Sequence, residues 1–221
     1  DYNIQDVEIV DALEDKMKLI DLQITMAYFA KCNYNDVYSQ VKMWDVIIYN
    51  YLRDKGIQVP LIERQSKSEA YAGAYVKDPQ VGLHKWVVSF DLNSLYPHLI
   101  MQYNISPETI VGMSETHPGV DDMLNKSFDT SHLPSINQTM TPNGALFSRE
   151  KHGFLPELME KMYTDRSATK KEMLKASQKF EETKDIKYKN MVPKLHNKQM
   201  ALKIALNSAY GAVGNQYFRF F

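Results

Sequence analysis

The 221-residue sequence lacks cysteine pairs, long apolar runs and any sizeable net charge, and each absence limits what the protein can be. Cys32 is the only cysteine, so the chain cannot form an internal disulfide. This excludes the class of small secreted domains that depend on disulfides for stability. It contains no run of about 18 apolar residues, as a membrane-spanning helix would require, so we expect no membrane partner. The formal net charge of −1 excludes a uniform basic field for binding nucleic acid.

Signals for zinc and for secretion are also missing. The six histidines form neither an H-x-x-x-H pair nor a Cys/His pattern, which argues against zinc. The first residues, DYNIQDVEIV, hold no basic or apolar leader of the kind found in signal peptides, and the last, NQYFRFF, are aromatic. We therefore expect a cytoplasmic protein whose two ends are cuts through a longer chain.

Apolar residues make up 44% of the sequence, which is enough for a packed core. In the first quarter their helical spacing predicts a helix over residues 4–31 and a second over 41–52. Residues 57–70 are polar, contain Pro60 and are typical of a linker.

The middle of the chain mixes short strands with loops. Apolar runs predict strands at 72–76 and 85–91, and the stretch NSLYPHLIMQY that follows predicts a helix. Residues 114–144, rich in Ser, Thr, Asn, Asp and Pro, indicate a loop with at most short elements.

The last third predicts two long helices. Residues 157–184 contain no Pro or Gly, residues 185–193 look like a break, and a second helix is expected over 194–210. Residues 160–205 carry twelve basic and six acidic side chains, so this antiparallel hairpin has a local charge of +6. Together with the short strands, the hairpin predicts an α+β fold.

The stretch VVSFDLNSLYP, residues 87–97, suggests a metal and phosphate site. A buried strand would deliver Asp91 to its end, where a divalent cation can reach the carboxylate. Asn93 and Ser94 can cap the following helix, whose first N–H groups can bind anionic oxygens. Taken alone, the stretch fits an ordinary capped turn after a strand even better.

A second group of side chains lies on the predicted hairpin. Arg166 and Lys170 are spaced i, i+4 on the first helix, and Lys203, Asn207 and Tyr210 share one face of the second. Three converging cations suit a triphosphate, and Lys203 can also protonate a leaving pyrophosphate.

The alternative is a solvated lysine-rich face, the ordinary interpretation for any one lysine. We assign Lys175, Lys179 and Lys184 to it, or to unspecific attraction for nucleic acid. Gly211, directly after Tyr210, leaves room for a base pair close to the backbone.

Four motifs in order resemble those of family B DNA polymerases. DLNSLYP, residues 91–97, is similar to their motif A, and KIALNSAYGAVGN, residues 203–215, to their motif B, K-x3-N-S-x-Y-G. YAGA, residues 71–74, resembles the Y-x-G-G/A motif, and YNIQD, residues 2–6, the third exonuclease motif. The flanking stretches SPETIVG and GNQYFRFF look most like the replicative enzymes of T-even-type bacteriophages, although the hairpin here is shorter.

The resemblance implies a role for each matched residue of motif A. Asp91 would be a catalytic Mg²⁺ ligand beside the Leu92 carbonyl, and the backbone amides of Ser94 and Leu95 would hold the triphosphate. Tyr96 would lie under the incoming sugar as a steric gate against a 2′-OH.

The other motifs carry further implied roles. Arg166, Lys170 and Lys203 would grip the triphosphate, Asn207 would line the site, and Tyr210 with Gly211 would abut the nascent base pair.

Two pairs lie outside this site. Tyr71 and Gly73 would contact the template strand, and Tyr2 with Asp6 would be the remnant of a 3′–5′ exonuclease site whose partner acids this chain does not contain.

The resemblance also implies a division of the chain. Its expected parts are the end of an exonuclease domain (1–18), an inter-domain segment of the N-terminal domain (19–61), the first half of the palm (62–155), the fingers hairpin (156–212) and the start of the returning palm (213–221).

The implied activity is DNA-directed addition of dNTPs to a primer 3′-OH at a two-metal Mg²⁺ site. Primer–template DNA, dNTP, the rest of the polymerase and a sliding clamp would be its partners. The second carboxylate motif of the family, Y-G-D-T-D-S, does not occur here, so we expect this chain to be inactive alone.

Three alternatives remain open. The chain could be a natural split-polymerase subunit, a basic helical hairpin that binds nucleic acid without catalysis, or a helical protein with chance matches.

Overall fold

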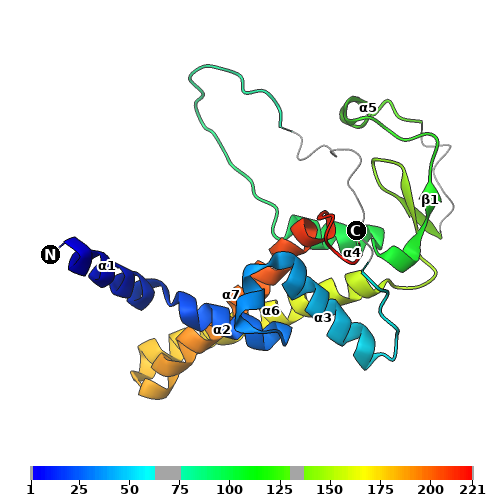
Figure 1. The fold of residues 1–221 in the computed structure, drawn as a ribbon. Coiled ribbons are helices and arrows are strands. Elements are labelled where there is room, and N and C mark those ends of the chain that lie inside the picture. The colour runs from blue at the N-terminus through cyan, green and yellow to red at the C-terminus, as the bar shows by residue number, and fades with distance from the viewer. Residues whose placement is uncertain (1, 63–75, 130–136, 221) are drawn as a thin grey trace.

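The computed structural model describes residues 2–62, 76–129 and 137–220, which form an α+β fold with long helices and one small sheet (Figure 1). Among these residues the elements are α1 (Tyr2–Met17), α2 (Leu19–Ala30), η1 (Tyr34–Tyr38), α3 (Gln40–Asp54), α4 (Leu95–Tyr103), η2 (Pro107–Thr109), β1 (Ile110–Met113), α5 (Val120–Asn125), β2 (Gln138–Met140), β3 (Ala145–Ser148), α6 (Phe154–Thr183) and α7 (Ile186–Val213). The sheet is antiparallel in the order β1-β3-β2. The predicted fold class is confirmed.

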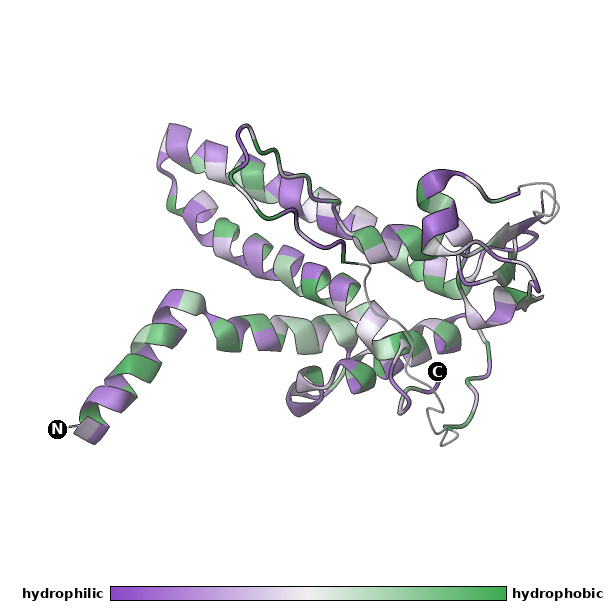
Figure 2. Ribbon diagram, turned by 90° about the horizontal axis from the view of Figure 1, so that it is seen from above, coloured by the Kyte–Doolittle hydropathy of each residue, from purple (hydrophilic) through white to green (hydrophobic). Residues whose placement is uncertain are grey.

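Helices α6 and α7 form the predicted antiparallel hairpin. Lys184 takes a left-handed conformation (φ 53°) and ends α6, and the Asp185 side chain accepts a hydrogen bond from Lys187 N at 2.8 Å to start α7. Figure 2 shows mostly hydrophilic colour at this free end, as its exposed lysines require.

The predicted break over 185–193 is wrong, because α7 begins at Ile186 and continues through Pro193. Proline costs the helix one hydrogen bond and some distortion, and the cap at Asp185 with packing along α6 offsets that cost.

The hydrophobic core lies where α7 meets α2, α3 and the first turns of α6. The most deeply buried residues of α7 are alanines and leucines: Ala201, Leu202, Ala205, Leu206, Ala209 and Ala212 are all at most 2% exposed. The alanines let the neighbouring backbones approach, and the large side chains Met43, Trp44 and Ile48 of α3, each 1% exposed, fill the space between them.

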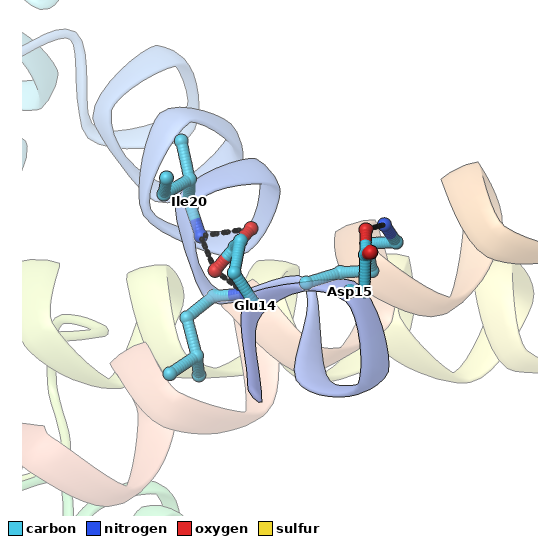
Figure 3. A network of polar contacts seen from close by, with 5 residues as sticks. Glu14, Asp15 and Ile20 are labelled. Atoms are coloured by element: carbon cyan, nitrogen blue, oxygen red, sulfur yellow. Dashed lines mark hydrogen bonds and ion pairs between the residues drawn. The ribbon is translucent and has the colours of Figure 1, made fainter. Parts of the chain in front are cut away.

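The helix predicted over 4–31 is two helices, because Lys18 adopts a left-handed conformation (φ 51°) between them. The Glu14 carboxylate accepts hydrogen bonds from the backbone N–H groups of Leu19 (3.0 Å) and Ile20 (3.1 Å), as Figure 3 shows for the labelled pair. This carboxylate caps the start of α2. Helix α1 buries none of its residues and projects away from the body (Figure 1).

The strand predicted over 85–91 does not form. Residues 76–94 run as a long loop that leaves the helices and returns at α4 (Figure 1), with Trp86 96% and Phe90 90% exposed. A strand needs a neighbouring backbone to pair its N–H and C=O groups, and the described residues place none beside this segment. The strand predicted at 72–76 falls almost entirely outside the described residues.

The sheet instead forms around the segment predicted to be mainly loop. Among the described residues of 114–144 only the short helix α5 and strand β2 occur, as expected for a loop with at most short elements, whereas β1 ends just before this segment at Met113 and β3 begins just after it at Ala145. In the part of the chain that the structure describes, no helix combines the length and apolar character needed to cross a membrane.

The C-terminal end of helix α3 also contacts the hairpin. Lys55, directly after α3, contacts the Glu157 carboxylate near the start of α6 at 2.5 Å. Hydrogen bonds from Lys55 and then Tyr51 lower the pKa of the Glu157 carboxyl, and the same contact with Glu157 raises the pKa of Lys55.

Beyond α7, the chain folds back onto α3 through Arg219. Its guanidinium forms a two-point pair with the Asp45 carboxylate, at 2.7 Å from Nε and 3.1 Å from the terminal nitrogen, and it also donates to the Pro60 carbonyl. Both side chains of the pair are mostly buried, at 16% and 23% exposed. Helix α3 therefore holds both α7 and the segment after it.

We expect Asp45→Ala to lower the free energy of unfolding of the 221-residue chain by about 1–3 kcal/mol, because it leaves a mostly buried guanidinium without its carboxylate and with the Pro60 carbonyl as its remaining acceptor. Urea titration followed by circular dichroism measures the change. Asp15→Ala, which removes an exposed pair with Lys18, is the control and should change little. An equal effect of both substitutions would contradict this account of Arg219.

Candidate active site

One polar cavity of about 750 Å³ collects most of the side chains singled out in the sequence. It opens between the start of α4 and the hairpin. Its lining residues are Phe90, Asp91, Leu92, Asn93, Ser94, Leu95, Tyr96, Arg166, Lys170, Lys203 and Asn207. Both predicted groups therefore face the same space.

The hairpin brings its cations together because they lie equally far from its turn. Arg166 lies 18 residues before Lys184, and Lys203 lies 18 residues after Asp185, so the two stand at the same level of the antiparallel pair. On α7 the buried face packs on α2 and α3, and the opposite face leaves Lys203, Asn207 and Tyr210 exposed.

The charge of the cavity suits an anion. Three cations line it, against the one carboxylate of Asp91. The Nε of Arg166 is buried and has no hydrogen-bond partner among the described residues. Buried donors are nearly always paired in native proteins, so an acceptor from outside the described residues, such as a phosphate oxygen or a water, would satisfy this donor.

Helix α4 begins without the side-chain cap that the sequence predicts. Ser94 is the N-cap residue but has a left-handed backbone (φ 52°) and makes no capping hydrogen bond, so the predicted capping role is wrong. Its carbonyl instead accepts hydrogen bonds from the His98 backbone at 3.2 Å and ring at 2.8 Å.

The free helix start has a chemical consequence. Pro97 has no N–H, so the donors at the helix start without an intrahelical acceptor are those of Ser94, Leu95 and Tyr96. The helix dipole favours negative charge at this end, which faces the cavity.

Two aromatic rings stack beside the cavity. The rings of Tyr96 on α4 and Tyr210 on α7 lie 4.5 Å apart at an interplanar angle of 10°. Tyr210 therefore backs the ring that the sequence assigns to the sugar of an incoming nucleotide.

Gly211 lies against a neighbouring helix. A Cβ at this position would sit 2.9 Å from the Oε1 of the exposed Gln40 side chain of α3, so a larger residue would displace that side chain. Its expected role beside a base pair stays a prediction.

The residues present fit a Mg²⁺ ion that is shared with a phosphate ligand. Mg²⁺ is commonly bound by one or two carboxylates plus phosphate oxygens, and the cavity offers the exposed Asp91 with the Leu92 backbone beside it. The described part of the chain contains no cluster of three His, Cys, Asp or Glu side chains that could hold a metal without a ligand's help.

The remaining predicted residues lie elsewhere. Tyr2 and Asp6 are exposed on the projecting helix α1, away from the cavity lining. Tyr71 and Gly73 fall outside the described residues, so their expected contacts with a template stay predictions.

Sequence reasoning missed Trp44 and Ser208. The indole Nε1 of Trp44 donates to Ser208 Oγ at 3.0 Å and to the Ala205 carbonyl at 3.1 Å. Ser208 lies inside the N-S-x-Y-G stretch, so the motif itself pointed to this residue. No local pattern marks Trp44 as a partner of a residue 164 positions away.

We expect the 221-residue chain to bind inorganic triphosphate, and Lys170→Ala to weaken that binding about tenfold, the effect of losing one charged hydrogen bond. Calorimetric titration at low salt gives the dissociation constant. Lys175→Ala is the control, because Lys175 lies on α6 outside this cavity. Equal losses in the two variants would mean that the hairpin attracts anions only through its general charge.

Comparisons with known proteins identify the family of the chain. Residues 36–221 match the family model described as DNA polymerase family B. The whole chain is 33% identical to the DNA-directed DNA polymerase of Escherichia phage RB69 and 31% identical to that of Enterobacteria phage T4, and it spans 28% of the length of each.

A solved structure shows the same fold. The family B DNA polymerase of the archaeon Pyrobaculum calidifontis superimposes with a TM-score of 0.64 over 95% of this chain and 24% of its own, at 24% identity. The match over residues 36–221 and the full-length alignments with the two phage enzymes place this chain in DNA polymerase family B.

Proposed function

We propose that the chain is the segment of a DNA-directed DNA polymerase that binds the incoming dNTP and presents it to a primer 3′-OH. The observation that carries the proposal is the single cavity where Asp91, the start of α4 and three hairpin cations meet. Family membership supports the reaction class, because the phage relatives are named DNA-directed DNA polymerases.

Each group in the cavity suits one part of the substrate. Arg166 and Lys170 would bind the triphosphate from α6, and the N–H groups of Ser94 and Leu95 would bind it from the start of α4. Lys203 can donate a proton to the leaving pyrophosphate. Tyr96, backed by Tyr210, would lie against the sugar.

Asp91, with the Leu92 carbonyl, would hold Mg²⁺ against the triphosphate. When bound, Mg²⁺ supplies a Lewis acid that stabilises the charge developing on the transferred phosphoryl group. Asp91 is the one carboxylate among the described residues that line the cavity, so the proposed two-metal mechanism needs a second acid from outside this lining.

The proposed division of the chain is supported by where its elements begin and end. The left-handed Lys18 separates α1 from α2 at the expected end of the exonuclease part, and α6 begins at Phe154, two residues before the expected fingers. Primer–template DNA, dNTPs, the rest of the polymerase and a sliding clamp are the proposed partners, in the cytoplasm of the host cell.

A second candidate function is a basic module that binds nucleic acid without catalysis, alone or as one subunit of a split polymerase. The observation that favours it is the exposed lysine-rich end of the hairpin, where Lys179 and Lys187 flank the ring of Tyr188 at 5.4 and 5.9 Å. Such a surface would bind DNA equally well whatever residue stood at position 91.

We expect Asp91→Asn in the full-length protein to reduce primer extension on the order of 10³-fold or more, because the neutral amide no longer holds the cation at the triphosphate. Single-nucleotide extension in Mg²⁺, with DNA affinity measured in parallel, separates catalysis from binding. Asp78→Asn, in the same loop but outside the cavity, is the matched control and should keep full activity.

Undiminished extension by the Asp91→Asn protein would contradict the proposal. In the same assay the 221-residue chain alone should extend no primer, since it supplies one of the two carboxylates. Extension by this chain at the rate of the full-length protein would show that the second acid is not needed.

A further inference from the structure

Trp44 connects α3 to the site helix through a buried polar contact. Its side chain is 1% exposed, and its single indole N–H is shared between Ser208 Oγ and the Ala205 carbonyl. The Ser208 hydroxyl, 7% exposed as a residue, in turn donates to the same carbonyl at 2.9 Å. An apolar residue could fill the space of the indole, but it could not donate the hydrogen bonds that join α3 to α7.

The contact fixes both the position of α7 along its helix axis and its rotation about that axis. Ser208 lies between Asn207, which lines the cavity, and Tyr210, which stacks beside it. One turn before Trp44 on α3, Gln40 lies against Gly211, so that two successive turns of α3 contact two successive turns of α7. A hydrogen bond demands a defined direction and distance, whereas apolar packing tolerates small slips.

The position of α7 in turn decides where the Tyr210 ring lies. That ring is the only described aromatic ring found in stacking contact with Tyr96, at 4.5 Å and 10°. A small rotation or slide of α7 would separate the two rings and leave Tyr96 free to move away from the sugar. Trp44 contacts Ser208, helix α7 carries both Ser208 and Tyr210, and Tyr210 contacts Tyr96.

We propose that Trp44 is a positioning residue for sugar selection: through Ser208 it holds α7 so that Tyr210 keeps Tyr96 in place as the gate. This inference rests on the proposed function, in which Tyr96 excludes a 2′-OH. Trp44 itself touches neither the cavity nor a substrate. Its effect should therefore appear in the choice between substrates more than in the rate with dNTP.

The experiment compares variants of the full-length protein by the ratio of kcat/KM for a ribonucleotide to that for the matching dNTP. Trp44→Phe removes the N–H and keeps an aromatic ring, and we expect the ratio to rise about fivefold, the equivalent of one hydrogen bond of ordinary strength. Ser208→Ala should raise it less, because the indole keeps the Ala205 carbonyl as acceptor. The melting temperature is recorded for every variant.

Two further variants make the result interpretable. Tyr96→Ala gives the full loss of selection and tests the gate itself. Ile48→Val removes one methylene from the same core, one turn beyond Trp44 on α3, and should lower the melting temperature while leaving the ratio unchanged. The central comparison is between Ile48→Val and the two variants of the hydrogen-bonded pair.

The outcomes are distinct. A raised ratio in Trp44→Phe and Ser208→Ala, with no change in Ile48→Val, supports the positioning role, and Ser208→Ala alone decides if Trp44→Phe fails to fold. The positioning role is overturned if the ratio rises equally in Trp44→Phe, Ser208→Ala and Ile48→Val. It is also overturned if the ratio stays unchanged in Trp44→Phe and Ser208→Ala while Tyr96→Ala loses selection. An unchanged ratio in Tyr96→Ala refutes the gate in the proposed function, and the positioning role falls with it.

Discussion

The hydrogen bonds from the buried indole of Trp44 to α7 are the constraint on which the site depends. Helix α7 presents mainly alanine and leucine to its neighbours, and such a surface allows close packing without specifying one position along the helix axis. The polar contact at Ser208 and Ala205 supplies that specification. This contact therefore sets the positions of the site residues on α7, because neighbouring residues of a helix move together.

The same helix α3 organises the surroundings of the site. It reaches the segment beyond α7 through the Asp45–Arg219 pair and the start of α6 through the Lys55–Glu157 contact. Both helices of the hairpin are thus held at their base, while their free end carries exposed charge (Figure 2). The cavity lies nearer the held end, where Arg166 and Lys203 face each other at equal distance from the turn.

The sequence predicted the features that local spacing determines. The hairpin and the two faces that carry Arg166, Lys170 and Lys203 follow from helical periodicity, and the structure brings these residues to one cavity. The strand over 85–91 could not be predicted correctly, because pairing depends on a neighbouring backbone and not on the segment's own apolar residues. The Trp44 contact was out of reach for a related reason, since it joins residues far apart in sequence that no periodic pattern connects.

The most direct test of the account is a crystal structure of the full-length protein with primer–template DNA, an incoming dNTP analogue that cannot react, and Mg²⁺. The account predicts triphosphate oxygens bound by Arg166, Lys170 and Lys203, a metal ion on the Asp91 carboxylate, and the sugar over the ring of Tyr96. A triphosphate bound away from the hairpin cations, or a metal site that excludes Asp91, would contradict it.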